Sequence, residues 1–88
     1  MANEMIHIGN SAFIPLDKIR VIVPADAGKV RRILKRKGIN QNSDRFWDTT
    51  SGLETRALIV LDNGMIVTSF VTSNAIVKRI NQNNDLEE

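Results

Sequence analysis

The sequence has no cysteine, and its 88 residues include one histidine. Without cysteine the chain forms no disulfide and offers no thiolate to a metal, and one histidine is too few for a metal site, whose ligands come in clusters. It has no glycine-rich phosphate loop, and most of its carboxylates fall in turns or near the C-terminus. We therefore predict no enzyme, no cofactor, no metal and no small-molecule substrate. His7 lies between Ile6 and Ile8 and is interpreted as a solvated strand residue.

Long apolar runs are also absent. No stretch approaches the roughly 18 residues that a membrane-spanning helix needs, and the N-terminus lacks the basic start and apolar core of a signal peptide. We therefore expect a cytoplasmic protein with no membrane partner. The chain is predicted to be a single domain over residues 1–80, followed by a polar, acidic and disordered tail over residues 81–88. A domain of this size has a thin core, so self-association is a natural source of stability.

Short β-branched runs bounded by glycine and proline predict the strands. They cover residues 5–8, 12–14, 18–23, 56–61 and 65–71. Asp62-Asn63-Gly64 separates the last two, and Asn-Gly between apolar runs indicates a hairpin because both residues tolerate positive φ. The chain is too short for two parallel crossovers. The expected fold class is α+β, with a small, mainly antiparallel sheet of about five short strands and two helices.

Two segments have helical spacing. The first begins after Asp26, a candidate N-cap, and stops at Gly38. Its apolar face consists of Ala27, Val30, Ile33 and Leu34. The second helix is expected to begin at Ser73 as its cap and to bury a stripe made of Ile76, Val77 and Ile80. Residues 38–44, between the first helix and the sheet, are read as a polar loop.

The first helix carries an unbalanced charge. Between residues 27 and 43 there are six Lys or Arg residues and no Asp or Glu. Five of them fill the arc opposite the apolar face, Lys29, Arg31, Arg32, Lys35 and Arg36, and the sixth is Lys37 at the end of the helix. One interpretation is that these cations only solvate an amphipathic helix. We favour binding of double-stranded DNA, because a solvated face normally mixes the two signs, whereas a face of one sign neutralises phosphates.

Aromatic residues are few, and none interleaves with the cations as in proteins that stack bases. Phe46 is expected to pack in the core. For Trp47, packing or a subunit interface is favoured over base stacking. A further hypothesis needs no nucleic acid: the thin core and the exposed edges of a small sheet also suit an assembly module.

The order of the elements and several residues resemble the RemA family of bacterial extracellular-matrix regulators. The similarity covers about residues 5–80. In that family the segment aligned with residues 48–57 reads Asp-Ala-Thr-Tyr-Gly-Arg-Arg-Thr-Arg-Ala. This chain matches it at six positions, Asp48, Thr50, Gly52, Thr55, Arg56 and Ala57. The resemblance implies a non-enzymatic DNA-binding protein that forms closed rings, holds DNA on a positive outer surface and activates biofilm-matrix genes.

The resemblance also assigns residues to the DNA surface. It places Lys18 where the family has a DNA-contacting arginine, which keeps the charge but loses the bidentate fork. The family's adjacent arginine pair is replaced by Leu53 and Glu54, so the turn loses two positive charges and gains a negative one. Arg56 matches, and either bridges subunits or pairs with Asp48. The connection over residues 38–47 is a few residues longer than in the family.

Two outcomes follow from the missing arginine pair. Either the basic helix takes over the DNA contact, or this member keeps the ring and has lost or altered its DNA binding. We favour the first. The predicted DNA-binding residues are Lys18, Arg20, Arg31, Arg32, Lys35, Arg36, Lys37 and Arg56.

Overall fold

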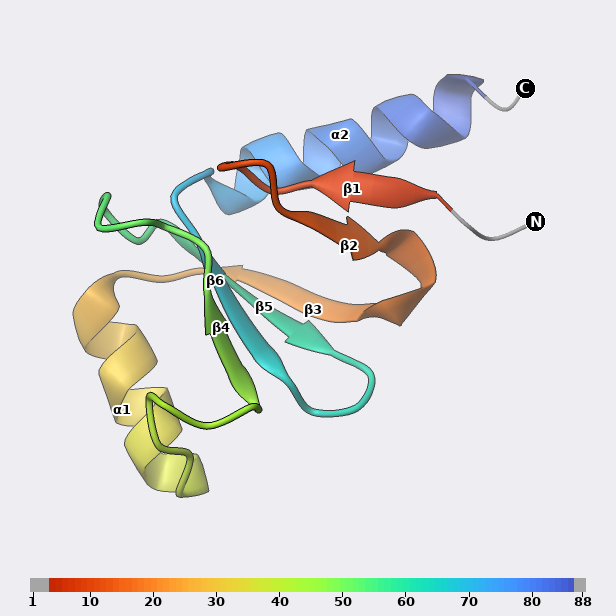
Figure 1. The fold of residues 1–88 in the computed structure, drawn as a ribbon. Helices are drawn as coiled ribbons and strands as arrows, with labels where there is room; N and C mark the ends of the chain where they lie inside the picture. Colours follow the sequence, from red (N-terminus) through yellow and green to blue (C-terminus); the bar gives the residue numbers. More distant parts are fainter. Residues whose placement is uncertain (1–3, 87–88) are drawn as a thin grey trace.

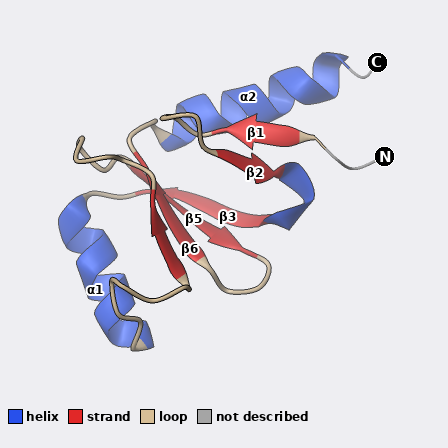
Figure 2. Cartoon of the chain, in the orientation of Figure 1, coloured by secondary structure: helices blue, strands red, loops and turns tan. Residues whose placement is uncertain are grey.

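The computed structural model describes residues 4–86, which form two helices, six strands and one short 3-10 turn (Figures 1 and 2). The elements in chain order are β1 (Met5–His7), β2 (Phe13–Pro15), the turn Leu16–Lys18, β3 (Ile19–Pro24), α1 (Ala27–Lys37), β4 (Phe46–Asp48), β5 (Ala57–Leu61), β6 (Ile66–Ser69) and α2 (Ser73–Leu86). β1 and β2 form an antiparallel pair, and the other strands form a second sheet in the order β3-β5-β6-β4. The predicted α+β class is confirmed.

The four-stranded sheet is covered on both faces. α1 lies against one face, and α2 lies against the other together with the β1–β2 pair (Figure 1). Side chains alternate along a strand, so β5 serves both layers. Ala57 and Ile59 pack with Ile76 of α2, whereas Leu58 packs with Leu34 of α1.

The hairpin between β5 and β6 is confirmed, but its turn differs from the prediction. Gly64 has φ +88°, whereas Asn63 does not have positive φ. The Gly64 amide donates to the Leu61 carbonyl at 2.9 Å, and the Leu61 amide donates to the Met65 carbonyl at 2.9 Å. This is a three-residue loop with a glycine after the tight turn, so only Gly64 needs the left-handed region. Asn63 acts instead through its side chain, which accepts from the Met65 amide at 2.9 Å.

The predicted ends of α1 are confirmed. Asp26 accepts the Lys29 amide at 2.8 Å, and Gly38 is left-handed with its amide donating to the Leu34 and Lys35 carbonyls. The predicted cap of α2 is wrong by one residue. Thr72 caps it, because its hydroxyl accepts the Ala75 amide at 3.2 Å.

α2 continues through Leu86 and so enters the segment predicted to be a disordered tail. Residues 87–88 of that predicted tail lie outside the described part of the chain. His7 is exposed between buried Ile6 and Ile8, as predicted, and its ring lies 4.9 Å from that of Phe13.

β4 is the strand that the sequence did not predict. Phe46 and Trp47 were expected to follow a loop into the sheet, and they form a strand that pairs with β6 in parallel. β3, α1 and β4 together make one crossover connection, which carries the chain from one edge of the sheet to the other. The remaining strand pairs are antiparallel.

Candidate nucleic-acid interface

The turn over residues 49–54 is fixed to the sheet by hydroxyl groups. One oxygen of Asp48, Oδ1, accepts the Thr50 amide at 3.0 Å, the Thr50 hydroxyl at 2.7 Å and the Thr68 hydroxyl at 2.8 Å. The Thr49 hydroxyl donates to the Thr68 carbonyl at 2.7 Å. We call this segment the threonine-anchored turn. Two of the matched family residues, Asp48 and Thr50, therefore set the shape of the turn.

The ionised form of Asp48 is favoured by this arrangement. Burial raises the pKa of Asp48, but the hydrogen bonds from Thr50 and Thr68 outweigh burial and leave the pKa below its ordinary value. The folded state therefore binds this proton less readily than the unfolded state. It follows that the contribution of Asp48 to stability is present above the unfolded pKa and is lost as pH falls through the folded pKa.

Asp48→Asn is expected to lower the free energy of unfolding by about 1 kcal/mol near pH 7, because the amide weakens three hydrogen bonds that the carboxylate accepts. The difference between the variant and the parent should shrink as pH falls below about 4. Urea unfolding of both proteins across a pH series measures it. A difference that stays constant down to low pH would contradict the role of the carboxylate charge.

The predicted DNA-binding residues are all exposed, but they do not form one site. Lys18 lies at the hairpin end of the β3–β5 pair, where its ammonium is 4.0 Å from Asp62. Arg56 lies at the other end, because Ile19 pairs with Leu61 and Pro24 pairs with Ala57. Arg20 is on β3, at the edge of the sheet.

Arg56 pairs with Glu54, with 3.2 Å between the guanidinium Nη2 and the carboxylate Oε1. The alternative that Arg56 pairs with Asp48 is therefore wrong. Asp48 instead accepts hydrogen bonds from Thr50 and Thr68 through Oδ1. Glu54 stands where the resemblance calls for arginine, and it also neutralises the arginine that the chain retains.

The cations of α1 lie along the whole length of the helix. We call them the cationic face of α1: Lys29, Arg31, Arg32, Lys35, Arg36 and Lys37, all exposed. Lys35, Arg36 and Lys37 lie in the last turn, where positive charge interacts favourably with the negative end of the helix dipole. Arg32 lies at the middle of the helix. Arg31 lines a smaller hollow beside Asp48 and Thr55.

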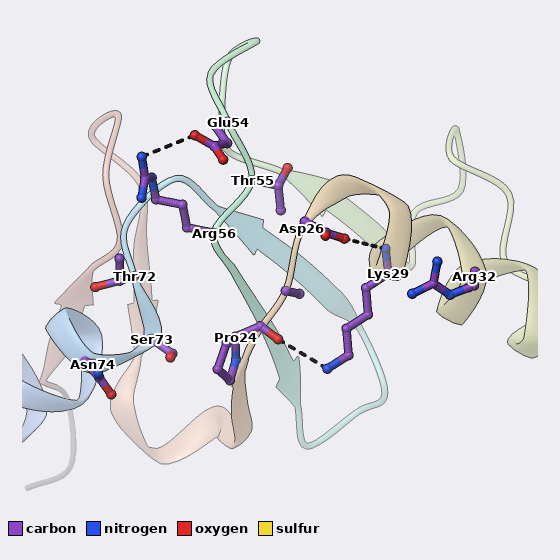
Figure 3. A pocket seen from close by; sticks show the side chains of 11 residues that line it. Pro24, Asp26, Lys29, Arg32, Glu54, Thr55, Arg56, Thr72, Ser73 and Asn74 are labelled. Atoms are coloured by element: carbon purple, nitrogen blue, oxygen red, sulfur yellow. Dashed lines mark hydrogen bonds and ion pairs between the residues drawn. The ribbon is translucent and has the colours of Figure 1, made fainter.

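An open groove of about 570 Å³ lies where the starts of α1 and α2 meet the end of the threonine-anchored turn (Figure 3). Its lining residues are Pro24, Ala25, Asp26, Lys29, Arg32, Glu54, Thr55, Arg56, Thr72, Ser73 and Asn74. The groove brings together two of the predicted residues, Arg32 and Arg56. Lys29 was not among the predicted site residues, although it belongs to the same basic segment, and no signal in the sequence connects it with Ser73.

The aromatic side chains take two different positions. Phe46 packs in the cluster between α1 and the sheet, as predicted. Trp47 is 40% exposed on the edge strand β4, and Leu53 is 56% exposed on the turn. Trp47 is therefore packed within the domain over only part of its surface.

The fold and this surface define a small α+β domain with a cationic helix. Among the side chains described over residues 4–82, no group of His, Cys, Asp or Glu is placed to hold a metal ion, and no described helix is long and apolar enough to cross a membrane. The chain belongs to the RemA-like family, described as extracellular matrix regulatory protein A-like, whose sequence profile matches residues 5–80.

Curated relatives agree with this assignment. A protein of Coprothermobacter proteolyticus is 33% identical over 82 residues, which cover 93% of this chain and 75% of that protein. Proteins of Bacillus cytotoxicus and Bacillus mycoides are each 30% identical over 88 residues, which cover all of this chain and 98% of each relative. All three carry the name "Putative regulatory protein".

Proposed function

We propose that this protein is a non-enzymatic, cytoplasmic DNA-binding regulator of the RemA type, which acts as a homo-oligomeric ring and controls biofilm-matrix genes. Membership of the RemA-like family and the regulatory names of the relatives support a regulatory role. The observation that carries the DNA proposal is the cationic face of α1. It is exposed, and none of its members forms a salt bridge with the side chains described over residues 4–82.

This face suits the phosphate backbone better than the bases. Exposed Lys and Arg side chains neutralise phosphates and release condensed counterions, which gives affinity without reading the sequence. Base stacking needs aromatic side chains interleaved with the cations, and α1 contains no aromatic residue. We therefore expect little preference among DNA sequences.

The direct test is a titration of purified protein against duplex DNA at low salt. Saturable binding with similar affinity for unrelated sequences is expected. The absence of binding at low salt would contradict the DNA proposal and leave the second candidate, a ring-forming assembly module without DNA. Exposed Trp47 and Val21 on the two edge strands of the sheet favour that candidate. A mass measurement in solution tests the ring separately, because a monomer would contradict it.

Leu53→Arg combined with Glu54→Arg is expected to strengthen duplex binding on the order of tenfold, because it restores the family's arginine pair and frees Arg56 from Glu54. Competition titrations at one salt concentration measure the change. Leu53→Gln with Glu54→Gln is the matched control and should recover only the part due to Glu54. Unchanged affinity in the arginine variant would show that the threonine-anchored turn does not face DNA.

A further inference from the structure

Two helices begin at the groove of Figure 3, and one of them has unused donors there. Thr72 closes the start of α2, since its hydroxyl accepts the Ala75 amide and its carbonyl accepts the Ile76 amide at 3.1 Å. The amides of Ser73 and Asn74 donate to no acceptor within residues 4–86. Free amides at the start of a 14-residue helix carry partial positive charge and suit an anion.

The side chain of Ser73 is a second and independent sign of a ligand. Ser73 is only 8% exposed, yet its hydroxyl has no hydrogen-bond partner within the described chain. Every fully enclosed side-chain polar atom of the described residues does have a partner, so the Ser73 hydroxyl must open onto the groove that it lines. Buried Ser69 shows the contrast, because its hydroxyl donates to the Ile8 carbonyl at 2.6 Å and accepts the Val71 amide at 2.9 Å.

The charged side chains around the groove leave an excess of one positive charge, which favours an anion. Lys29, Arg32 and Arg56 face two carboxylates, Asp26 and Glu54. Asp26 is already used within α1, because the hydrogen bond from the Lys29 amide holds it and lowers its pKa. Glu54 is different: it is an exposed side chain on the turn, and among the described residues it pairs with Arg56 alone.

We propose that this groove binds a phosphate group. The phosphate oxygens would accept the amides of Ser73 and Asn74 and the Ser73 hydroxyl, and Arg56 would supply the opposing charge as a bidentate donor. In the structure Glu54 forms an ion pair with Arg56. This ion pair must break before the Arg56 guanidinium can bind the phosphate through two hydrogen bonds. The phosphate comes either from a free phosphate ester or from the backbone of DNA, and the chemistry of recognition is the same for both.

The experiment titrates ¹⁵N-labelled protein with inorganic phosphate, with a nucleoside monophosphate and with a short duplex, each against chloride at matched ionic strength. A saturable shift of the Ser73 and Asn74 amides with phosphate or the monophosphate supports a free ester as the source. A shift with the duplex alone supports the DNA backbone. A response no different from that to chloride in all three titrations overturns the proposal.

Four variants define the site. Ser73→Ala and Arg56→Gln should each weaken phosphate binding about tenfold, and Glu54→Gln should strengthen it a few-fold by releasing Arg56. Lys78→Gln, an exposed cation of α2 that does not line the groove, is the matched control and should bind as the parent does. Arg56 is exposed, so its variant should fold even where Ser73→Ala does not. Equal binding by Arg56→Gln and the parent also overturns the proposal.

The inference does not depend on the proposed function. Phosphate binding without duplex binding would support the phosphate site in the groove and contradict the DNA proposal. Duplex binding that leaves the Ser73 and Asn74 amides unshifted, with no response to the free esters, would do the reverse.

Discussion

Neutralising the cationic face of α1 is expected to weaken duplex DNA binding strongly. The variant replaces four exposed residues with glutamine: Arg31, Arg32, Lys35 and Arg36. Glutamine keeps nearly the same helix propensity as Arg and Lys, so α1 and its apolar face should persist. If about six phosphates are neutralised by the parent, removing four contacts should weaken binding by at least about 100-fold at moderate salt. Fluorescence anisotropy with a labelled duplex measures the loss.

A matched pair of double variants separates position from total charge. Arg31→Gln with Arg32→Gln removes two charges from the cationic face. Arg45→Gln with Lys78→Gln removes two exposed charges elsewhere. The first pair should weaken binding much more than the second. Equal effects of the two double variants would mean that net charge, rather than the position of the charges on α1, determines affinity. Undiminished binding by the fourfold variant would indicate that Lys18 and Arg20 contact the DNA instead.

Raising salt from about 50 mM to about 200 mM is expected to weaken duplex binding by roughly 10³-fold in the parent protein, because about six neutralised phosphates give a slope near −5 in log affinity against log salt. The fourfold glutamine variant should retain a slope of only about −2, and so lose roughly tenfold over the same range. The measurement is a set of titrations at four or more salt concentrations.

The slope distinguishes this mechanism from base recognition. A contact that depends on hydrogen bonds to base edges is much less sensitive to salt than one that depends on counterion release. A flat dependence in the parent protein would therefore contradict a phosphate-based interface even if binding itself is strong. Exchanging chloride for another monovalent anion is a useful control, because anions that enter the groove beside Ser73 would compete with DNA.

Those parts of the fold that depend on local sequence could be predicted. α1 has its N-cap, its apolar period and its glycine stop within one segment. The structure confirms the cap, the stop and the burial of Val30 and Leu34, whereas Ala27 of the predicted apolar face is exposed. The hairpin was predicted from Asn63-Gly64, although its turn uses the left-handed region at Gly64 alone. β4 could not be predicted in this way. It has three residues, and its partner β6 lies about 20 positions later, so no local pattern marks the pair.

The candidate site shows the same limit. The sequence predicts that the cations are exposed, and they are, because long charged side chains on a helix or an edge strand stay in water. It does not predict that Lys18 and Arg56 lie at opposite ends of the sheet, since that follows from the register of β3 on β5. Nor does it show that Arg32, Arg56 and Ser73, from three separate segments, line one groove.

β5 links the two sides of the domain. Ala57 and Ile59 complete the layer under α2, and Leu58, between them, completes the layer under α1. Losing either helix would uncover one face of a strand whose other face is still required. The two clusters are therefore expected to melt as one cooperative unit, so a defect that begins at α1 is felt at α2 and at the groove where both helices start.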